Sequence, residues 1–159
     1  MSGAKDTSAS RLIETTRKLL SGLEKYADQL ALQRDATMRF DVTLLGRVTL
    51  AKEQALGELI ATTRVQRDAL DDTWRKTLEG DTSLPEQLDQ ALQALGERTE
   101  DHGQRHALLE LSKRARHVQR VLAERQAENE TLTRRSLRWI NTCLVDSPMT
   151  RGVGYTNQG

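Results

Sequence analysis

The sequence predicts an all-α protein, and three observations support this prediction. Leu, Ala, Glu, Gln and Arg dominate the 159 residues, as is typical of long helices. Aromatic residues make up only 3% of the chain, whereas sandwich and α/β cores usually take more volume from aromatic side chains. Only two prolines are present, which leaves room for uninterrupted helices. The expected architecture is a long antiparallel helical hairpin packed with one long or kinked C-terminal helix, followed by a flexible tail.

The first helix is expected over about residues 10–38, after a polar leader at 1–9 in which Asp6, Ser8 or Ser10 can act as N-cap. Its apolar positions alternate spacings of four and three, which is the heptad pattern of a packed helix seam. These positions are Leu12, Thr16, Leu19, Leu23, Tyr26 and Leu30. A helix of this length spans roughly 40 Å and therefore has to pack lengthwise against another long helix.

The second helix is expected over about residues 41–78. Asp41 is a suitable N-cap after a break between Met38 and Phe40. One face of this helix is apolar and is expected to pack on the first helix. Its members are Leu44, Leu45, Val48, Ala51, Ala55, Leu59, Ala69, Leu70 and Trp74.

A loop and a short helix are expected next. Residues 80–83 form the clearest loop of the chain. Pro85 is expected in the first turn of a helix over about residues 84–96, where a missing N–H costs no hydrogen bond. Two glycines indicate a kink or a short loop within residues 96–104, so the sequence leaves open whether 84–145 form one helix or two.

The last helix is expected over about residues 104–145 and is stopped by Asp146, Ser147 and Pro148. Its apolar seam continues to its C-terminal end. The seam consists of Leu108, Leu111, Ala115, Val118, Leu122, Asn129, Leu132, Ser136, Ile140 and Leu144. Residues 10–145 are therefore expected to form a single elongated bundle domain, followed by a flexible tail at 146–159.

Composition and charge exclude several classes of function. The 24 basic and 23 acidic residues give a net charge of +1, without the basic excess that usually neutralises nucleic-acid phosphates. Acidic residues dilute the basic patches around residues 113–120 and 134–138, so no nucleic-acid partner is expected. The N-terminus lacks the apolar core of a signal peptide, and no stretch has the roughly 20 apolar residues of a membrane span. A cytoplasmic protein without an integral membrane segment is expected.

No catalytic or metal-binding pattern is found, so neither enzymatic activity nor a cofactor is expected. His102 and His106 have the four-residue spacing that some zinc sites use, but Gly103 stands where a zinc protease has glutamate. We interpret the two histidines as solvated. The single cysteine, Cys143, cannot form an internal disulfide and is expected to be a buried or half-buried apolar side chain.

The end of the last helix is the candidate binding surface. Apolar side chains there cover more of the circumference than one packing seam requires. They are Leu132, Leu137, Trp139, Ile140 and Leu144. One interpretation is that Trp139 only covers the end of the bundle. The functional interpretation is a surface that binds an amphipathic helix of a partner protein.

Three features in the same order resemble a known family. The first is LLSGLEKYADQLALQRDATMRFDVTLLGRVTLAKEQALGELIATTRVQRDAL, with an acidic turn at Asp41, a leucine pair, Lys52 and Arg64 or Arg67. The second is RQAENETLTRRSLRWINTCL, with Gln126, Asn129 and Leu132. The third is a tail that carries Tyr155 and ends at Gly159. In this order they are similar to the FlgN-type flagellar export chaperones. Gln126, where that family often has Asn, and Thr156, after the tyrosine, depart from its pattern.

The resemblance implies a cytoplasmic chaperone of flagellar type III export. Its clients would be the C-terminal amphipathic segments of the hook-associated proteins FlgK and FlgL, bound around the five apolar residues of the last helix and protected from premature assembly. Tyr155 would engage the cytoplasmic domain of the export gate. A structural coiled-coil adaptor, or a helical bundle that only self-associates, remains the alternative, because both would share the same helix pattern.

Overall fold

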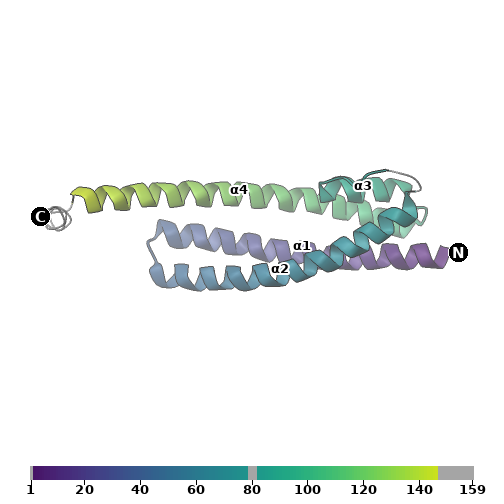
Figure 1. Cartoon of the computed structure of the whole chain (residues 1–159), viewed down its shortest axis with the longest axis horizontal. Coiled ribbons are helices and arrows are strands. Elements are labelled where there is room, and N and C mark those ends of the chain that lie inside the picture. Colours follow the sequence, from purple (N-terminus) through teal and green to yellow (C-terminus); the bar gives the residue numbers. More distant parts are fainter. Residues whose placement is uncertain (1, 79–81, 147–159) are drawn as a thin grey trace, which may run out of the picture.

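The computed structural model describes residues 2–78 and 82–146, and this part of the chain is all-α, as predicted (Figure 1). Its helices are α1 (Ser2–Met38), α2 (Val42–Thr77), α3 (Leu88–Arg98) and α4 (His102–Asp146). The expected antiparallel hairpin is formed by α1 and α2. The predicted flexible tail lies outside the described residues, apart from Asp146, which ends α4.

The α1–α2 hairpin is held by the predicted heptad seam. Leu12, Thr16, Leu19 and Leu30 are buried, and every position of the predicted apolar face of α2 is buried or half-buried. Gly22 permits close packing here, because a Cβ at this position would lie 2.9 Å from Leu59 Cδ2. The spacing of apolar residues therefore determines which faces of α1 and α2 meet.

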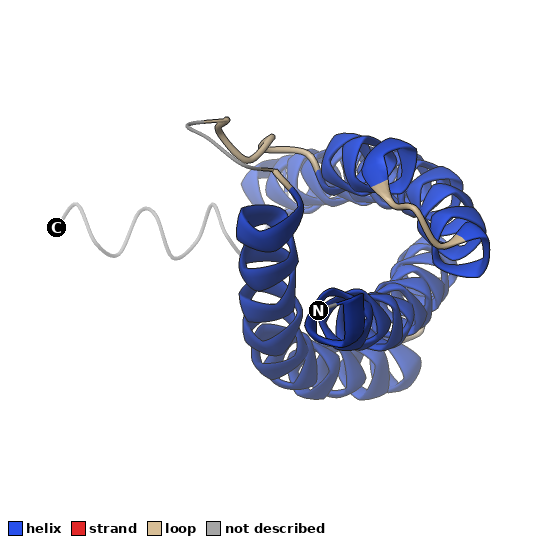
Figure 2. Ribbon diagram, turned by 90° about the vertical axis from the view of Figure 1, so that its right-hand side faces the viewer, coloured by secondary structure: helices blue, strands red, loops and turns tan. Residues whose placement is uncertain are grey.

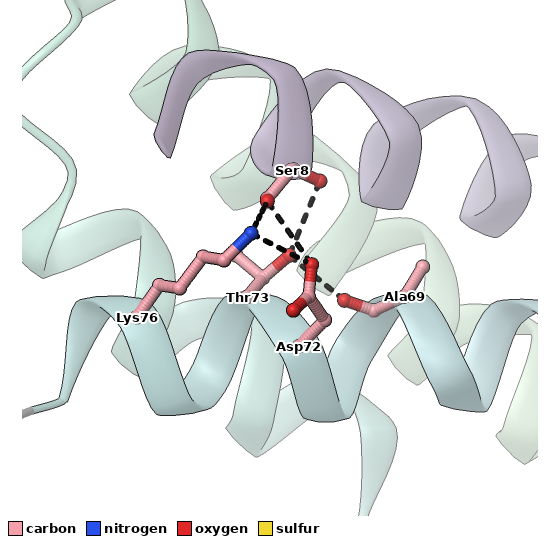
Figure 3. Close-up of polar contacts among 5 residues, drawn as sticks. All are labelled: Ser8, Ala69, Asp72, Thr73 and Lys76. Atoms are coloured by element: carbon pink, nitrogen blue, oxygen red, sulfur yellow. Dashed lines mark hydrogen bonds and ion pairs between the residues drawn. The ribbon is translucent and has the colours of Figure 1, made fainter. Parts of the chain in front are cut away.

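The prediction that residues 1–9 form a polar leader before the first helix is wrong, because the chain is helical from its second residue. Ser8 explains the difference: it is buried against α2 instead of capping a helix (Figure 3). Its hydroxyl donates to Asp72 Oδ2 at 3.1 Å and accepts from Lys76 Nζ at 2.8 Å. Thr73 Oγ1 donates to the Ser8 carbonyl at 3.1 Å. These contacts with a distant part of the chain hold the first turns of α1 in place.

The turn between α1 and α2 confirms Asp41 as the N-cap of α2. Its carboxylate accepts from the backbone N–H of Leu44 at 3.0 Å. The preceding residue, Phe40, has a φ of 52°, a left-handed conformation that usually favours glycine at helix ends. The backbone N–H of Asp41 donates to the Ala36 carbonyl at 3.0 Å, which closes the end of α1.

The prediction for Pro85 is wrong, because α3 begins only at Leu88 and Pro85 lies in the connection before it. This connection packs against the bundle. Trp74 Nε1 donates to the carbonyl of Thr82 at 3.0 Å, and Leu84 packs on the hydrophobic core. Because these contacts hold the connection against α2, the helix starts later than the position of proline suggested.

The structure divides the C-terminal half into two helices. The turn between α3 and α4 lies at residues 99–101, and Asp101 accepts from the backbone N–H of Gln104 at 2.8 Å. Gly96 lies within α3, where a Cβ would be only 2.9 Å from Leu109 Cδ2. Gly96 therefore allows close packing of α3 on α4 and does not mark a loop.

The helices form a bundle, and the set of helices that makes up its cross-section changes along its length (Figures 1 and 2). Helix α1 packs against both α2 and α4, α3 packs mainly on α4, and among the described residues the backbones of α2 and α4 stay more than 8 Å apart. The main core lies where α3 is present and includes Leu12, Trp74, Leu92 and Leu108. We call the part beyond α3, towards the α1–α2 turn, the distal half. Helix α4 continues past this turn (Figure 1).

Candidate helix-binding site

The distal end of α4 exposes the apolar residues predicted from the sequence. Leu137, Trp139, Ile140 and Leu144 are 54%, 60%, 42% and 53% exposed, and Leu132 is half-buried. The same helix buries several apolar residues where α1 and α3 cover it, for example Leu108. Exposed apolar side chains clustered on one element are typical of a binding surface.

These side chains point to two sides of α4. Leu137, Ile140 and Leu144 follow spacings of three and four and share one face. Trp139 is two residues from Leu137 and therefore lies roughly 200° around the helix. Its ring centroid is 5.8 Å from that of Phe40 at the α1–α2 turn. Trp139 thus partly covers the end of the hairpin, while the other three residues have no partner ring among the described residues.

A groove runs beside these residues, with α1 as its floor and α2 and α4 as its walls. Its volume is about 440 Å³. The residues that line it are Tyr26, Leu30, Gln33, Lys52, Gln126, Asn129, Glu130, Thr133 and Arg134. The groove exists because α2 and α4 both pack on α1 while their backbones stay more than 8 Å apart.

Polar side chains order the middle of this groove. Lys52 Nζ donates to Gln33 Oε1 at 2.8 Å and lies 5.8 Å from the centre of the Tyr26 ring. Asn129 Nδ2 donates to the Leu30 carbonyl at 2.9 Å. The ammonium of Lys52 has no carboxylate partner among the described residues, whereas the neighbouring Arg134 pairs with Glu130. The groove is therefore amphipathic, with one cation left for a ligand.

Ion pairs and hydrogen bonds fix α4 on α1, and one of them involves Arg114 of the basic patch noted at residues 113–120. Arg114 Nε donates to Glu24 Oε1 at 2.6 Å, and this hydrogen bond holds the pKa of the Glu24 carboxyl below its usual value. Arg34 Nη1 lies 2.9 Å from Glu128 Oε2, and Arg125 Nη1 donates to the Ala27 carbonyl at 2.7 Å. These contacts set the position of α4 along α1, and with it the width of the groove.

Few side chains with catalytic or metal-binding chemistry are grouped in the structure. Within residues 2–78 and 82–146, no cluster of three or more His, Cys, Asp or Glu side chains has metal-site geometry. His102 and His106 are both exposed at the start of α4. Cys143 is exposed as well, so the expectation that it is buried is wrong, because α4 extends beyond its neighbours there. Tyr155 lies outside the described residues.

The sequence did not identify the α2 side of the site. Leu56 and Ile60 are exposed apolar residues on α2, and Lys52 lines the groove. Leu56 and Ile60 are four residues apart, beside the apolar face that packs on α1, and this spacing was the signal available. The groove itself has no signal in the sequence, because residues of three helices form it.

Comparison with protein-family models, with curated proteins and with solved structures found no match to the chain. Within the part of the chain that the structure describes, none of the helices has a segment of the length and apolar character that a bilayer span requires.

Proposed function

We propose that the protein binds an amphipathic helical segment of another protein and has no catalytic role. The supporting observation is the exposed apolar face of distal α4, formed by Leu137, Ile140 and Leu144. Amphipathic helices dock on such surfaces through residues spaced three and four apart. Covering the surface would remove apolar side chains of both proteins from water.

The α4 face alone gives little net binding free energy. Each apolar side chain of the α4 face is about half exposed, so burying the rest yields roughly 1 kcal/mol per residue. A partner segment that folds on binding gives back about 2–5 kcal/mol in ordering. The α4 face alone therefore comes close to balancing this cost, and a stable complex needs further contact surface beside it.

In finer detail, we propose a cytoplasmic chaperone of flagellar type III export. It would bind the C-terminal segments of the hook-associated proteins FlgK and FlgL, prevent their premature assembly and deliver them to the export gate. The support is the resemblance of the sequence to FlgN-type chaperones, together with the position of the exposed apolar residues on the last helix. A client segment that is disordered when free would fold as it covers this face.

The client proposal is tested by calorimetry and by size-exclusion chromatography with light scattering, using the C-terminal segment of a hook-associated protein. A stoichiometric complex is expected, and the double variant Leu137→Ser/Ile140→Ser should weaken it at least tenfold. Leu50→Ser is the matched control: Leu50 is equally exposed but lies two residues from the buried Val48, on the side of α2 that faces away from α1. A chain that only self-associates, with no heat from the client segment, would support the adaptor alternative instead.

The role proposed for Tyr155 is tested separately. Tyr155→Ala should leave binding of the client segment unchanged and weaken binding to the cytoplasmic domain of the export gate. Pull-down with each partner in parallel measures both effects. Equal loss of the two interactions would reject this division of labour.

A further inference from the structure

Helix α3 occupies the fourth helix position of the bundle, next to α2 and α4. It fills this position along only part of the length of the bundle. Leu70 and Trp74 of α2 are 6% and 7% exposed and share a buried cluster with residues of α3. Leu56 and Ile60 lie two heptads before them and therefore on the same side of α2. They are 42% and 56% exposed. The apolar stripe on α2 thus continues into the distal half, where α3 no longer covers it.

Helix α4, which forms the opposite wall of the groove, also carries apolar residues beyond the part that α3 covers. Leu109 of α4 packs against Gly96, and Arg116, one heptad later, donates to Asp89 Oδ2 at 3.3 Å, so this side of α4 faces α3. Leu137 and Leu144 lie four and five heptads after Leu109, on the same side of the helix. Both are exposed. Both walls that contact α3 in one half therefore carry exposed apolar residues at the same heptad positions in the other half, although Glu130 of α4 interrupts this series.

Between these apolar ends, the groove is polar and carries a net positive charge. Of its charged lining residues, Glu130 pairs with Arg134, which leaves Lys52 as the surplus cation. Gln33 and the ring of Tyr26 hold the Lys52 side chain in place. A carboxylate brought to this ammonium in a half-enclosed groove would form a charge-assisted hydrogen bond.

We propose that the partner segment is a single amphipathic helix that occupies the empty half of this fourth position, in line with α3. The helix buries apolar residues against Leu56 and Ile60 at one end and against Leu137 and Leu144 at the other, and it presents an acidic residue to Lys52 near its middle. This inference rests on the proposed function and names the chemistry of its ligand. A helix that follows α2 from Ile60 to its start has about 18 residues, or roughly 27 Å.

Charge disfavours a second copy of the chain as the occupant. The segment of a second copy that exposes neighbouring apolar residues at helical spacing is distal α4, which carries Arg134, Arg135 and Arg138. Docking that segment would bring arginines towards Lys52, and like charges in a groove repel each other. A helix with an acidic centre has the opposite and favourable arrangement.

The test uses a synthetic amphipathic peptide of about 20 residues, with leucines in heptad positions at both ends and one glutamate at its centre. Calorimetry measures its binding to the full chain and to variants. Lys52→Glu should weaken binding at least tenfold, and a peptide with lysine in place of glutamate should restore it. Leu56→Ser/Ile60→Ser should also cost at least tenfold, whereas the control Leu50→Ser should change the dissociation constant less than twofold. Circular dichroism confirms that each variant stays folded.

A hook-associated C-terminal segment, measured with the same variants, separates this inference from the proposed function. If both probes bind and respond to the α2 and Lys52 variants, both proposals hold. If the hook segment binds but responds only to Leu137→Ser/Ile140→Ser, the function stands and the groove inference is rejected. If only the synthetic peptide binds, and responds as expected, the inference holds and the flagellar assignment falls. Binding by neither probe, or light scattering that shows a dimer which Lys52→Glu or Leu56→Ser/Ile60→Ser dissociates, overturns the inference.

Discussion

Two glycine substitutions test whether α3 packs on α4 as closely as the structure shows. Gly96 of α3 and Gly57 of α2 both lie inside helices, so alanine should improve helix propensity at each by about 0.5–1 kcal/mol. Their surroundings differ. Nothing lies within 4 Å of a Cβ built at Gly57, whereas a Cβ at Gly96 would be 3.0 Å from Leu109 Cγ and 3.4 Å from Leu108 Cβ.

The two variants should therefore change stability in opposite directions. Gly57→Ala is expected to raise the free energy of unfolding by about 0.5–1 kcal/mol. Gly96→Ala carries the same gain but also overpacks the α3–α4 contact, which costs about 1–3 kcal/mol. The difference between the variants isolates the packing cost, because the propensity gain is common to both. For a chain of this size, each 1 kcal/mol corresponds to a shift in Tm of about 2–4 °C.

Urea unfolding followed by circular dichroism, fitted with a shared m-value, measures both free energies. Thermal unfolding gives an independent order of the three proteins, with Gly57→Ala highest and Gly96→Ala lowest. Equal stabilisation by the two substitutions would mean that α3 does not press on α4 at Gly96. The position of α3, and the argument that it fills half of the fourth bundle position, would then be wrong.

Three further predictions follow from individual contacts. Gln66 Nε2 donates to Thr16 Oγ1 at 3.2 Å between buried side chains, so Thr16→Val alone should cost about 1–3 kcal/mol, whereas Thr16→Val/Gln66→Leu should be nearly neutral in urea unfolding. The pKa of Glu24 is lowered by its hydrogen bond from Arg114, so the pair stabilises the fold above pH 4.5, and this contribution is lost as the pH falls through the lowered pKa. Because both side chains are partly exposed, the effect should stay below about 1 kcal/mol, and Glu24→Gln should remove it from urea midpoints measured between pH 7 and pH 3. Cys143 is exposed, so its thiol should react with a maleimide in the native protein about as fast as in urea; strong protection in the free chain would show that distal α4 is already covered.

Local patterns in the sequence predicted much of the fold. The seam that begins at Leu12 and Thr16 was readable because heptad spacing places residues on one face whatever the helix packs against. Asp41 was recognisable as a cap because its carboxylate acts on a backbone N–H three residues away. Ser8 and Pro85 were misjudged because their segments pack on α2: Thr73, 65 residues away, donates to the Ser8 carbonyl, and Trp74 donates to the carbonyl of Thr82 in the connection before α3.

The exposed end of α4 was the part of the candidate site that the sequence could predict. Leu137 and Ile140 stood out because apolar residues there exceed what one seam needs. Lys52 was noted only as part of the family-like pattern, and Leu56 was not noted, because a lysine or a flanking leucine on an amphipathic helix is ordinary until its neighbours are known. Trp139 fits both interpretations given for it: it covers the end of the hairpin by contacting Phe40, and it remains largely exposed as part of a binding surface would.

The sequence by itself determined that this chain forms long helices, which faces of them are apolar, and that the last helix carries more apolar surface than it can bury alone. Only the tertiary structure decided that α3 is too short to cover both walls of the bundle, and that Lys52 stands between two exposed apolar ends. The physical reason is the distance along the chain over which each kind of interaction acts. Helix periodicity and capping act over a few residues, whereas a groove depends on where α2 and α4, far apart in the chain, come to lie on α1.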